Sequence, residues 1–243
     1  MHRKNGPDKA FYFKQFHIQH DRCAMKVGTD GVLLGAWVPL SPSVESILDI
    51  GKGTGLIALQ LAQRCDAQVI DAVEIETNAF EQAVENFENS DWSDRLFCYH
   101  ASLQEFKEEI DEKYDLIVSN PPYFKDTYKT GKEERMMARH NGSLSFEELL
   151  GAASALLSEI GTCAFIIPFA EEENFIKIAR HNALYPQRIT RVRGHGKSPL
   201  KRSLLHLGFK DINPEINELT IETERHVYTE KYIELVKGFY QKM

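Results

Sequence analysis

Short apolar runs alternate with amphipathic segments through the middle of the chain, and this alternation predicts its secondary structure. Near-continuous apolar runs of about four to eight residues are typical of strands that are covered on both faces of a sheet. Such runs occupy residues 46–50, 68–75, 96–100, 114–119 and 162–168. Apolar residues at helical spacing predict helices between them, at residues 56–64, 78–89, 145–158 and 171–181. Repeated strand–helix units predict a parallel sheet with right-handed crossovers and helices on both faces.

The pattern changes after Pro186. Residues 187–193 and 202–210 are expected to form two strands, joined by the glycine-rich, basic connection GHGKSPLK. The last segment, TEKYIELVKGFYQKM, carries apolar residues at helical spacing and is expected to be an amphipathic helix. We therefore expect an α/β fold with a seven-stranded, mostly parallel sheet that ends in an antiparallel C-terminal hairpin.

The composition fits one cytoplasmic domain. A chain of 243 residues with 42% hydrophobic content can bury a sizeable core. The chain has no apolar run of about 18 residues, and its N-terminus lacks the apolar stretch of a secretory signal, so we expect no membrane contact. Four scattered cysteines form no CxxC pair, which argues against a zinc site or a disulfide scaffold and favours a reducing compartment.

Charge is distributed unevenly along the chain. The net charge of −7 argues against a general nucleic-acid coat. Residues 187–207, however, contain six cations and no Asp or Glu. This basic group consists of Arg188, Arg191, Arg193, Lys197, Lys201 and Arg202. We expect it to contact the phosphates of a nucleic acid, although an edge strand that uses cations to prevent aggregation would look the same.

A glycine-rich turn follows the first predicted strand. Asp49 ends the apolar run, and Gly51, Gly53 and Gly55 follow at every second position. Glycines permit positive φ and a close approach of the backbone to a ligand, and the amides of the next helix then face that ligand. The spacing is GxGxG and not the GxGxxG of a pyrophosphate loop. The preceding acid favours a cationic or zwitterionic ligand, and the alternative is an ordinary tight turn.

Glu74 lies at the end of the second predicted strand, about 20 residues after the glycines. A carboxylate at this place can accept hydrogen bonds from both hydroxyls of a ribose. A solvated loop acid is the alternative, but the position directly after an apolar strand favours ribose binding.

The most specific motif is Asn120-Pro121-Pro122-Tyr123, directly after the fourth predicted strand. Two prolines restrict φ and remove two backbone donors, so that carbonyl groups are left to accept hydrogen bonds. Asn120 adds an amide oxygen, and Tyr123 adds a flat face for stacking. Together these groups suit an exocyclic amine on a planar ring, and the alternative is a rigid turn with a buried tyrosine.

These motifs together resemble a class I S-adenosylmethionine-dependent methyltransferase with a Rossmann-like fold. Further segments extend the resemblance to nearly the whole chain: FKQFHIQHDRCAMKVGTDGVLLGAW, LDIGKGTGLIALQLAQR, YDLIVSNPPYF and YTEKYIELVKGFY. They are similar to the tRNA adenine N6-methyltransferases that modify adenosine 37 of a valine tRNA. The resemblance implies one domain over residues 1–243, in which residues 1–40 lead into a catalytic core at residues 41–243.

The resemblance also implies roles for the motif residues. Asn120 and the carbonyl of Pro121 would accept hydrogen bonds from the target amine, and Tyr123 would stack on an adenine taken out of its own stack. The loop after this motif, KDTYKTGKEERMMARH, is mixed in charge. We expect it to fold over the target base, with Arg135 and Arg139 near the phosphates of the RNA, and a mobile flap is the alternative. The residues expected to hold the cofactor are Thr29, Asp30, Asp49, Gly51, Gly53, Gly55, Glu74, Ser102 and Asn120.

Two positions depart from the family pattern. Ser102 stands where an acid usually lies near the adenine of the cofactor. Lys52 stands inside the glycine turn, where a small residue is expected, and we predict that its side chain points to solvent or to the methionyl carboxylate. Lys52 also supports an alternative, a non-catalytic RNA-binding protein on this fold. A second alternative, N5-methylation of a protein glutamine, would require a peptide-binding domain before the core.

The expected partner is therefore tRNA, and the expected cofactor is S-adenosylmethionine. We expect no DNA substrate, because a DNA adenine methyltransferase would bring a larger recognition domain. We expect no metal, because methyl transfer to an aligned amine needs none. A monomer is the default expectation for the oligomeric state.

Overall fold

The computed structural model describes residues 10–23, 26–122 and 144–243. The strands of its main sheet are, in chain order, β3 (Ser46–Ile50), β4 (Val69–Glu74), β5 (Leu96–His100), β6 (Tyr114–Ser119), β7 (Leu157–Pro168), β8 (Tyr185–His195), β9 (Leu200–Gly208), β10 (Glu215–Glu224) and β11 (Val227–Tyr228). The helices are α1 (Thr29–Trp37), α2 (Leu56–Arg64), α3 (Thr77–Glu88), α4 (Leu103–Glu109), α6 (Phe146–Leu156), α7 (Glu172–His181) and α8 (Glu230–Val236).

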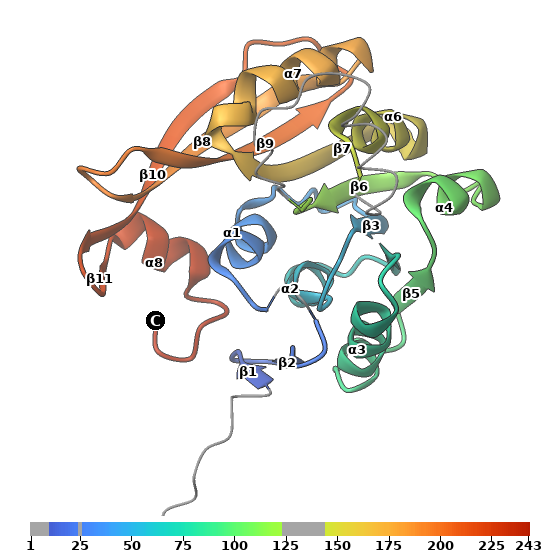
Figure 1. Ribbon diagram of the computed structural model, residues 1–243, viewed down its shortest axis with the longest axis horizontal. Helices are drawn as coiled ribbons and strands as arrows, with labels where there is room; N and C mark the ends of the chain where they lie inside the picture. The colour runs from blue at the N-terminus through green and yellow to red at the C-terminus, as the bar shows by residue number, and fades with distance from the viewer. Residues whose placement is uncertain (1–9, 24–25, 123–143) are drawn as a thin grey trace, which may run out of the picture.

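The sheet has the order β11-β10-β8-β9-β7-β6-β3-β4-β5 (Figure 1). From β7 to β5 all neighbours are parallel. β9 is antiparallel to β7 and to β8, so the expected C-terminal hairpin is confirmed. In the described residues the sheet has nine strands where the sequence predicted seven. β10 and β11 are additional, because β10 extends the sheet beyond β8 and pairs with both β8 and β11.

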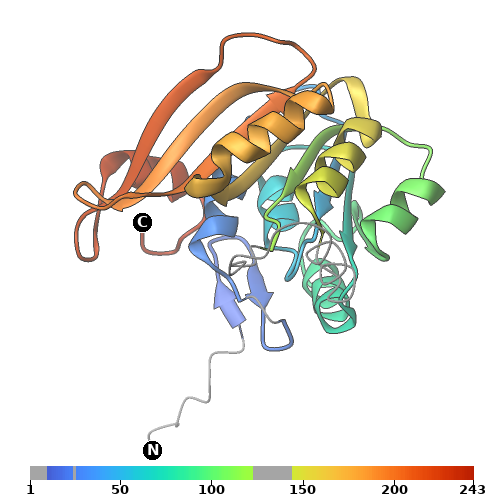
Figure 2. The ribbon, with the colours of Figure 1, turned by 45° about the horizontal axis from the view of Figure 1, so that its top comes forward.

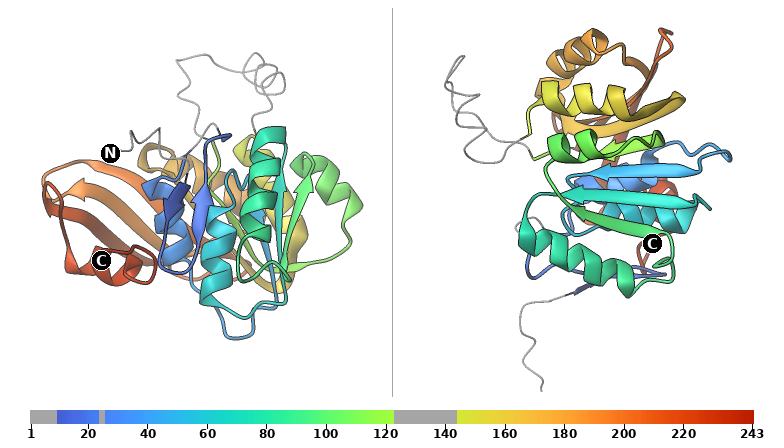
Figure 3. Two further views of the ribbon diagram at one scale, coloured as in Figure 1. Left: turned by 90° about the horizontal axis from the view of Figure 1, so that it is seen from below. Right: turned by 90° about the vertical axis from the view of Figure 1, so that its right-hand side faces the viewer.

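Helices cover both faces of the sheet, as expected (Figure 3). Alternate side chains of each central strand point to opposite faces, so Ile47 packs with α1, α2 and α8 on one face. Its neighbour Leu48 packs with α4, α6 and α7 on the other face. This two-sided burial explains the near-continuous apolar runs of the central strands.

Three strands and one helix have the predicted bounds, namely β3, β5, β6 and α2. The N-terminal part was not predicted in detail. It contains α1 and a hairpin of β1 (Ala10–Tyr12) and β2 (His17–Gln19), which lies outside the main sheet (Figure 2). The hairpin meets the C-terminal segment through a bridge between Phe13 and Tyr240. No helix among the described residues is long and apolar enough to cross a membrane.

The topology places the predicted motifs at one edge of the sheet. The chain runs from β3 to β4 on one side, whereas β6 lies on the other side of β3, so the strand order reverses between β3 and β6. Ligands of open α/β sheets bind outside the carboxyl ends of the strands at such a point. The turn between β8 and β9 lies at the same edge, because β9 is antiparallel to both β7 and β8.

Candidate active site

The end of β6 is held against the beginning of the glycine turn. Ile50 and Ser119 are register partners, and the Ser119 hydroxyl donates a hydrogen bond to the carbonyl oxygen of Ile50 at 2.8 Å. Asn120 is half-buried, Pro121 is buried and Pro122 is exposed. The two motifs that lie 69 residues apart are therefore neighbours. Tyr123, Arg135 and Arg139 lie outside the described residues.

The glycine turn has the backbone that its sequence predicts. Gly51, Gly53 and Gly55 have φ angles of 67°, 53° and 80°, which side chains with a Cβ rarely adopt. A Cβ at Gly51 or Gly53 would meet no atom within 4 Å, whereas one at Gly55 would lie 2.5 Å from the ring of Phe87. The first two glycines thus leave open space beside the backbone, which fits a bound ligand, and the third also allows the turn to pack on α3.

Asp49 presents a buried carboxylate to this turn. Its side chain is 0% exposed, and Oδ2 accepts a hydrogen bond from the Ala58 amide at 3.2 Å. Among the described residues, Oδ1 has no hydrogen-bond partner. Burial raises the pKa of Asp49 to about 7, and the Lys52 ammonium and the Ala58 amide oppose that rise. An unpartnered, buried acceptor fits a ligand that brings a positive charge or a donor.

Glu74 is oriented by the backbone around it. Oε2 accepts from the Gly53 amide at 2.9 Å, and Oε1 accepts from the amides of Ile75 and Glu76 at 3.0 Å each. A carboxylate offers about four lone-pair positions, so about one remains for a ligand. Glu74 therefore joins the end of β4 to the glycine turn, and its contact with a ribose stays a prediction.

Two of the other predicted cofactor residues, Ser102 and Asp30, have structural partners. Ser102 is the N-cap of α4: its hydroxyl accepts from the Glu105 amide at 3.2 Å and donates to the Glu105 carboxylate at 2.7 Å. Thr29 is the exposed first residue of α1. Asp30 forms an ion pair with Arg202 at 2.7 Å. These contacts fix the positions of the side chains, and their contact with a cofactor stays a prediction.

The first predicted direction of the Lys52 side chain, towards solvent, is wrong. Its side chain is 5% exposed, so it does not point to solvent. Nζ lies 5.4 Å from the ring centroid of Phe80 on α3. The second predicted direction, towards the methionyl carboxylate of a cofactor, is left as a prediction.

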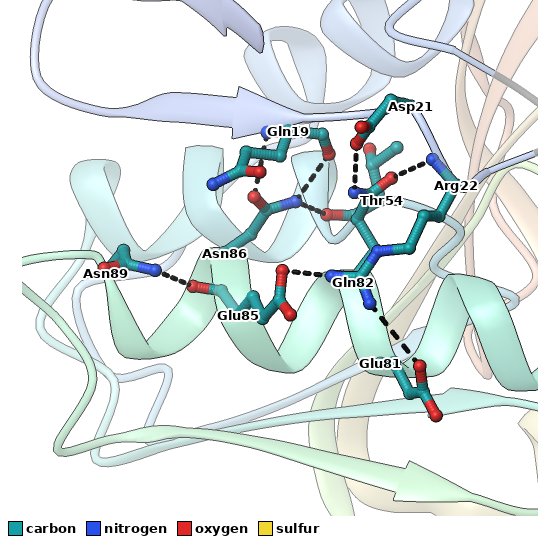
Figure 4. A network of polar contacts seen from close by, with 9 residues as sticks. All are labelled: Gln19, Asp21, Arg22, Thr54, Glu81, Gln82, Glu85, Asn86 and Asn89. Atoms are coloured by element: carbon teal, nitrogen blue, oxygen red, sulfur yellow. Dashed lines mark hydrogen bonds and ion pairs between the residues drawn. The ribbon is translucent and has the colours of Figure 1, made fainter. Parts of the chain in front are cut away.

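Asn86 ties the N-terminal segment to the glycine turn. This residue of α3 is 3% exposed. Its Nδ2 donates to the carbonyl oxygens of Thr54 at 2.8 Å and Gln19 at 3.0 Å, and its Oδ1 accepts from the Gln19 amide at 2.9 Å (Figure 4). One side chain thus connects α3, the glycine turn and the end of β2.

Gln82, one helical turn earlier, extends this connection. Its Oε1 accepts from the Arg22 amide at 2.9 Å, and its Nε2 donates to Asp21 at 2.8 Å (Figure 4). Sequence reasoning missed both amides. The signal was present, since Gln82 and Asn86 are polar residues one turn apart beside the apolar residues Ala83 and Phe87 on the same helix.

The basic group is less free than its sequence suggests. Three of its members form ion pairs with acids from distant parts of the chain: Arg191 with Glu172, Arg193 with Glu218 and Arg202 with Asp30. Arg188 packs over the ring of Trp37 at 4.9 Å. Arg188 lies seven residues before His195, the last residue of β8. Along a strand this corresponds to a distance of about 23 Å from the β8–β9 turn. Lys197 in this turn and Lys201 at the start of β9 are exposed, and neither has an ion-pair partner in the described part of the chain.

Comparison with known proteins identifies similar chains and folds. The model of the methyltransferase small domain family matches residues 31–161. The tRNA1(Val) (adenine(37)-N6)-methyltransferase of Christiangramia forsetii is 58% identical over 97% of this chain and 99% of its own length. The protein of the same name from Flavobacterium psychrophilum is 59% identical over 96% of this chain and 100% of its own length.

A solved structure shares the fold at low identity. A predicted O-methyltransferase from Agrobacterium tumefaciens superposes with a TM-score of 0.68 at 20% sequence identity, over 86% of this chain and 96% of that one. The expected fold class, a Rossmann-like class I methyltransferase, is confirmed.

Proposed function

This chain belongs to the tRNA1(Val) (adenine(37)-N6)-methyltransferase family, and we propose that it methylates N6 of adenine 37 in that tRNA. The donor is S-adenosylmethionine, which supplies, when bound, a methyl group on a positively charged sulfur. The observation that supports the assignment most is the contact of Ser119 with Ile50, which holds Asn120 and Pro121 beside the glycine turn.

Asn120 and Pro121 are proposed to activate the target amine. An amine on an aromatic ring is a poor nucleophile, because its lone pair is delocalised into the ring. The amide oxygen of Asn120 and the carbonyl oxygen of Pro121 can each accept one of the two N6 hydrogens, which favours a pyramidal nitrogen with a directed lone pair. Tyr123 is proposed to stack on the adenine and hold it in place. Alignment of the two reacting groups is then the main catalytic contribution.

The cofactor is proposed to lie on the glycine turn. Open space at Gly51 and Gly53 and the unpartnered Oδ1 of Asp49 fit a compact ligand that carries a positive charge. Glu74 is proposed to contact the ribose through its remaining lone pair. The other proposed contacts are those of Thr29, Asp30, Gly55, Ser102 and Asn120.

A methyl-transfer assay tests this function. The purified chain is incubated with tritiated S-adenosylmethionine and a transcript of tRNA1(Val). We expect label in this transcript and none in a matched transcript with guanine at position 37. Equal labelling of the two transcripts would contradict the assigned position. No labelling of either, with a folded protein, would favour the non-catalytic alternative.

We also propose that the β8–β9 turn contacts the tRNA backbone. The turn lies at the same edge of the sheet as Asn120, and its two exposed cations, Lys197 and Lys201, are available for phosphates. Arg193 and Arg202 flank the turn and would have to exchange an acidic partner for a phosphate. Arg139 is proposed to assist from the loop after Tyr123. Arg191 and Arg188 also remain candidates, although Arg191 is held by Glu172 and Arg188 lies far from the turn.

Replacing Lys197 and Lys201 together by alanine is expected to weaken tRNA binding about tenfold. Each lost phosphate contact should also reduce the slope of log K against log salt by about one. Filter binding at several salt concentrations measures both quantities. Lys210→Ala is the matched control, because Lys210 is an exposed lysine beyond the opposite end of β9. An effect of similar size for Lys210→Ala would show that only the total charge matters.

Packing between distant segments of the described chain supports one domain. Phe13 and Phe239 belong to the same hydrophobic cluster as α1 and α2. We propose that the chain acts as a monomer in the cytoplasm, where tRNA is modified. A mass near 27.8 kDa in light scattering would support the monomer.

A further inference from the structure

Asp30 is fixed on a rigid support and holds a residue from the other end of the chain. Nε of Arg202 donates to Oδ2 of Asp30 at 2.7 Å, and the two residues lie 172 positions apart. Asp30 belongs to the first turn of α1, and the rest of this helix, residues 31–37, is buried. At its far end Trp37 donates a hydrogen bond to the hydroxyl of Thr190 on β8 at 2.9 Å. Because α1 is packed along its length, Asp30 restrains Arg202 more than Arg202 restrains Asp30.

Arg202 lies beside a bulge at the start of β9. Val192 of β8 is the register partner of Arg202, and the next residue, Arg193, pairs with Leu200, so that Lys201 is passed over. Lys201 is therefore the extra residue of a β-bulge, a feature that interrupts the ladder and changes the direction of a side chain. Nη1 of Arg202 donates to the carbonyl oxygen of Lys201 at 3.0 Å. The guanidinium of the ion pair thus also holds the backbone of the bulge.

The two ion pairs that flank the β8–β9 turn differ in the burial of their acids. Glu218, the partner of Arg193, has a side chain that is 53% exposed, whereas the side chain of Asp30 is 27% exposed. An acid with less access to water loses more when its cation leaves. We therefore expect Arg202 to stay with Asp30 when a phosphate approaches. Lys201 is exposed and has no ion-pair partner in the described part of the chain, so it is the cation that a phosphate can bind at lower cost.

On the basis of the proposed tRNA contact, we propose that Asp30 is a positioning residue for tRNA binding. Through the guanidinium of Arg202 it fixes the bulge, and the fixed bulge determines where Lys201 presents its ammonium to a phosphate of the substrate. Arg202 itself does not contact the tRNA. The proposed contact of Asp30 with the cofactor would use its other carboxylate oxygen, so the two roles can be measured separately with each ligand alone.

The sign of the effect separates positioning from a simple effect of charge. If Asp30 only competed with phosphates for Arg202, its removal would free a cation, and tRNA would bind more tightly with a steeper dependence on salt. If Asp30 positions the bulge, its removal leaves Lys201 less ordered, and a longer list of conformations must be given up on binding. Binding then becomes weaker even though a negative charge has been removed from the tRNA-binding edge.

Filter binding of the tRNA1(Val) transcript at several salt concentrations, without cofactor, tests the inference. Asp30→Ala is expected to weaken binding about threefold, the share of one lysine in the tenfold effect expected for two, and to reduce the slope of log K against log salt by about one. Asp30→Asn removes the same charge but keeps an acceptor for Arg202, so its affinity should lie between those of Asp30→Ala and the wild type. Glu218→Gln is the matched control, because it removes the exposed acid of the neighbouring ion pair, and it should leave the affinity unchanged or raise it.

A double-mutant cycle shows whether Asp30 acts through Lys201. In a Lys201→Ala background, Asp30→Ala should change the tRNA affinity by less than about 1.5-fold, because the contact that it positions is already lost. In a Lys197→Ala background the full effect of about threefold should remain. A role of Asp30 in stability alone would produce neither this dependence on Lys201 nor the change in the salt slope.

Several outcomes would overturn the inference. They are tighter tRNA binding by Asp30→Ala, an unchanged affinity in the folded variant, and an equal loss with and without Lys201. If circular dichroism shows that Asp30→Ala is unfolded, Asp30→Asn decides, and a wild-type affinity for that variant would count against the inference. These results leave the proposed function intact as long as the wild-type protein methylates the transcript. If the folded wild-type protein neither binds nor methylates the transcript, the proposed function fails, and the inference fails with it.

Discussion

Replacing Asn120 by alanine is expected to lower the rate of methyl transfer to tRNA by about 100- to 1,000-fold. Removal of one positioned hydrogen-bonding group from an active site typically has an effect of this size. The amide oxygen of Asn120 is proposed to accept a hydrogen from the target amine, and alanine has no acceptor. Single-turnover kinetics with saturating cofactor and tRNA measure the loss directly, because they isolate the chemical step from binding and release.

Two further measurements define the role of Asn120. Asn120→Asp keeps an oxygen acceptor and should retain more activity than Asn120→Ala. The dissociation constant of S-adenosylmethionine for Asn120→Ala shows whether Asn120 also contacts the cofactor, as the sequence predicts. An alanine variant within about threefold of the wild-type rate would contradict the proposed role, since a lost acceptor at the reacting amine should cost far more.

Replacing Asn86 by alanine is expected to lower the free energy of unfolding by about 2–5 kcal/mol. The substitution removes three hydrogen bonds and leaves the buried carbonyl of Thr54 and the half-buried backbone groups of Gln19 without their side-chain partner. Each unsatisfied group costs about 1–3 kcal/mol. The same change should weaken cofactor binding, because Thr54 belongs to the glycine turn. Urea denaturation measures the stability, and calorimetry with S-adenosylmethionine measures the binding.

Asn89→Ala is the matched control for this prediction. Asn89 caps the same helix, but it is exposed, and within the described residues its side chain donates one hydrogen bond, to the Glu85 carbonyl (Figure 4). Its loss should cost less than about 1 kcal/mol and leave the cofactor affinity unchanged. Similar losses for the two variants would show that the contacts of Asn86 with the turn and with β2 add nothing to an ordinary helix substitution.

Local motifs of this chain were predictable because their chemistry is short-range. Three glycines at alternate positions require positive φ, and the structure has positive φ at all three. The apolar runs of β3 and β6 mark buried strands whose bounds agree with the prediction. The position of Asn120 directly after β6 was predictable, because the apolar run of this strand ends at the preceding residue, Ser119. In each case, the residues that determine the conformation are adjacent in sequence.

Contacts between distant residues were not predictable in the same way. The basic group has no acid within residues 187–207, yet Glu172, Glu218 and Asp30 neutralise three of its cations. The addition of β10 next to β8 brings Glu218 to Arg193, and the start of β9 at the catalytic edge brings Arg202 to Asp30. Only two lysines of the group are left exposed without an acid among the described residues.

The sequence by itself determined the strands of the central sheet, the glycine turn and the family to which the chain belongs, because apolar period, backbone preference and motif spacing are properties of neighbouring residues. Tertiary structure alone decided that the Lys52 side chain is buried, that Asn86 joins β2 to Thr54, and which cations have no acidic partner near the β8–β9 turn. These outcomes depend on which elements pack together, and burial and charge pairing are set by partners that lie tens to more than a hundred residues away.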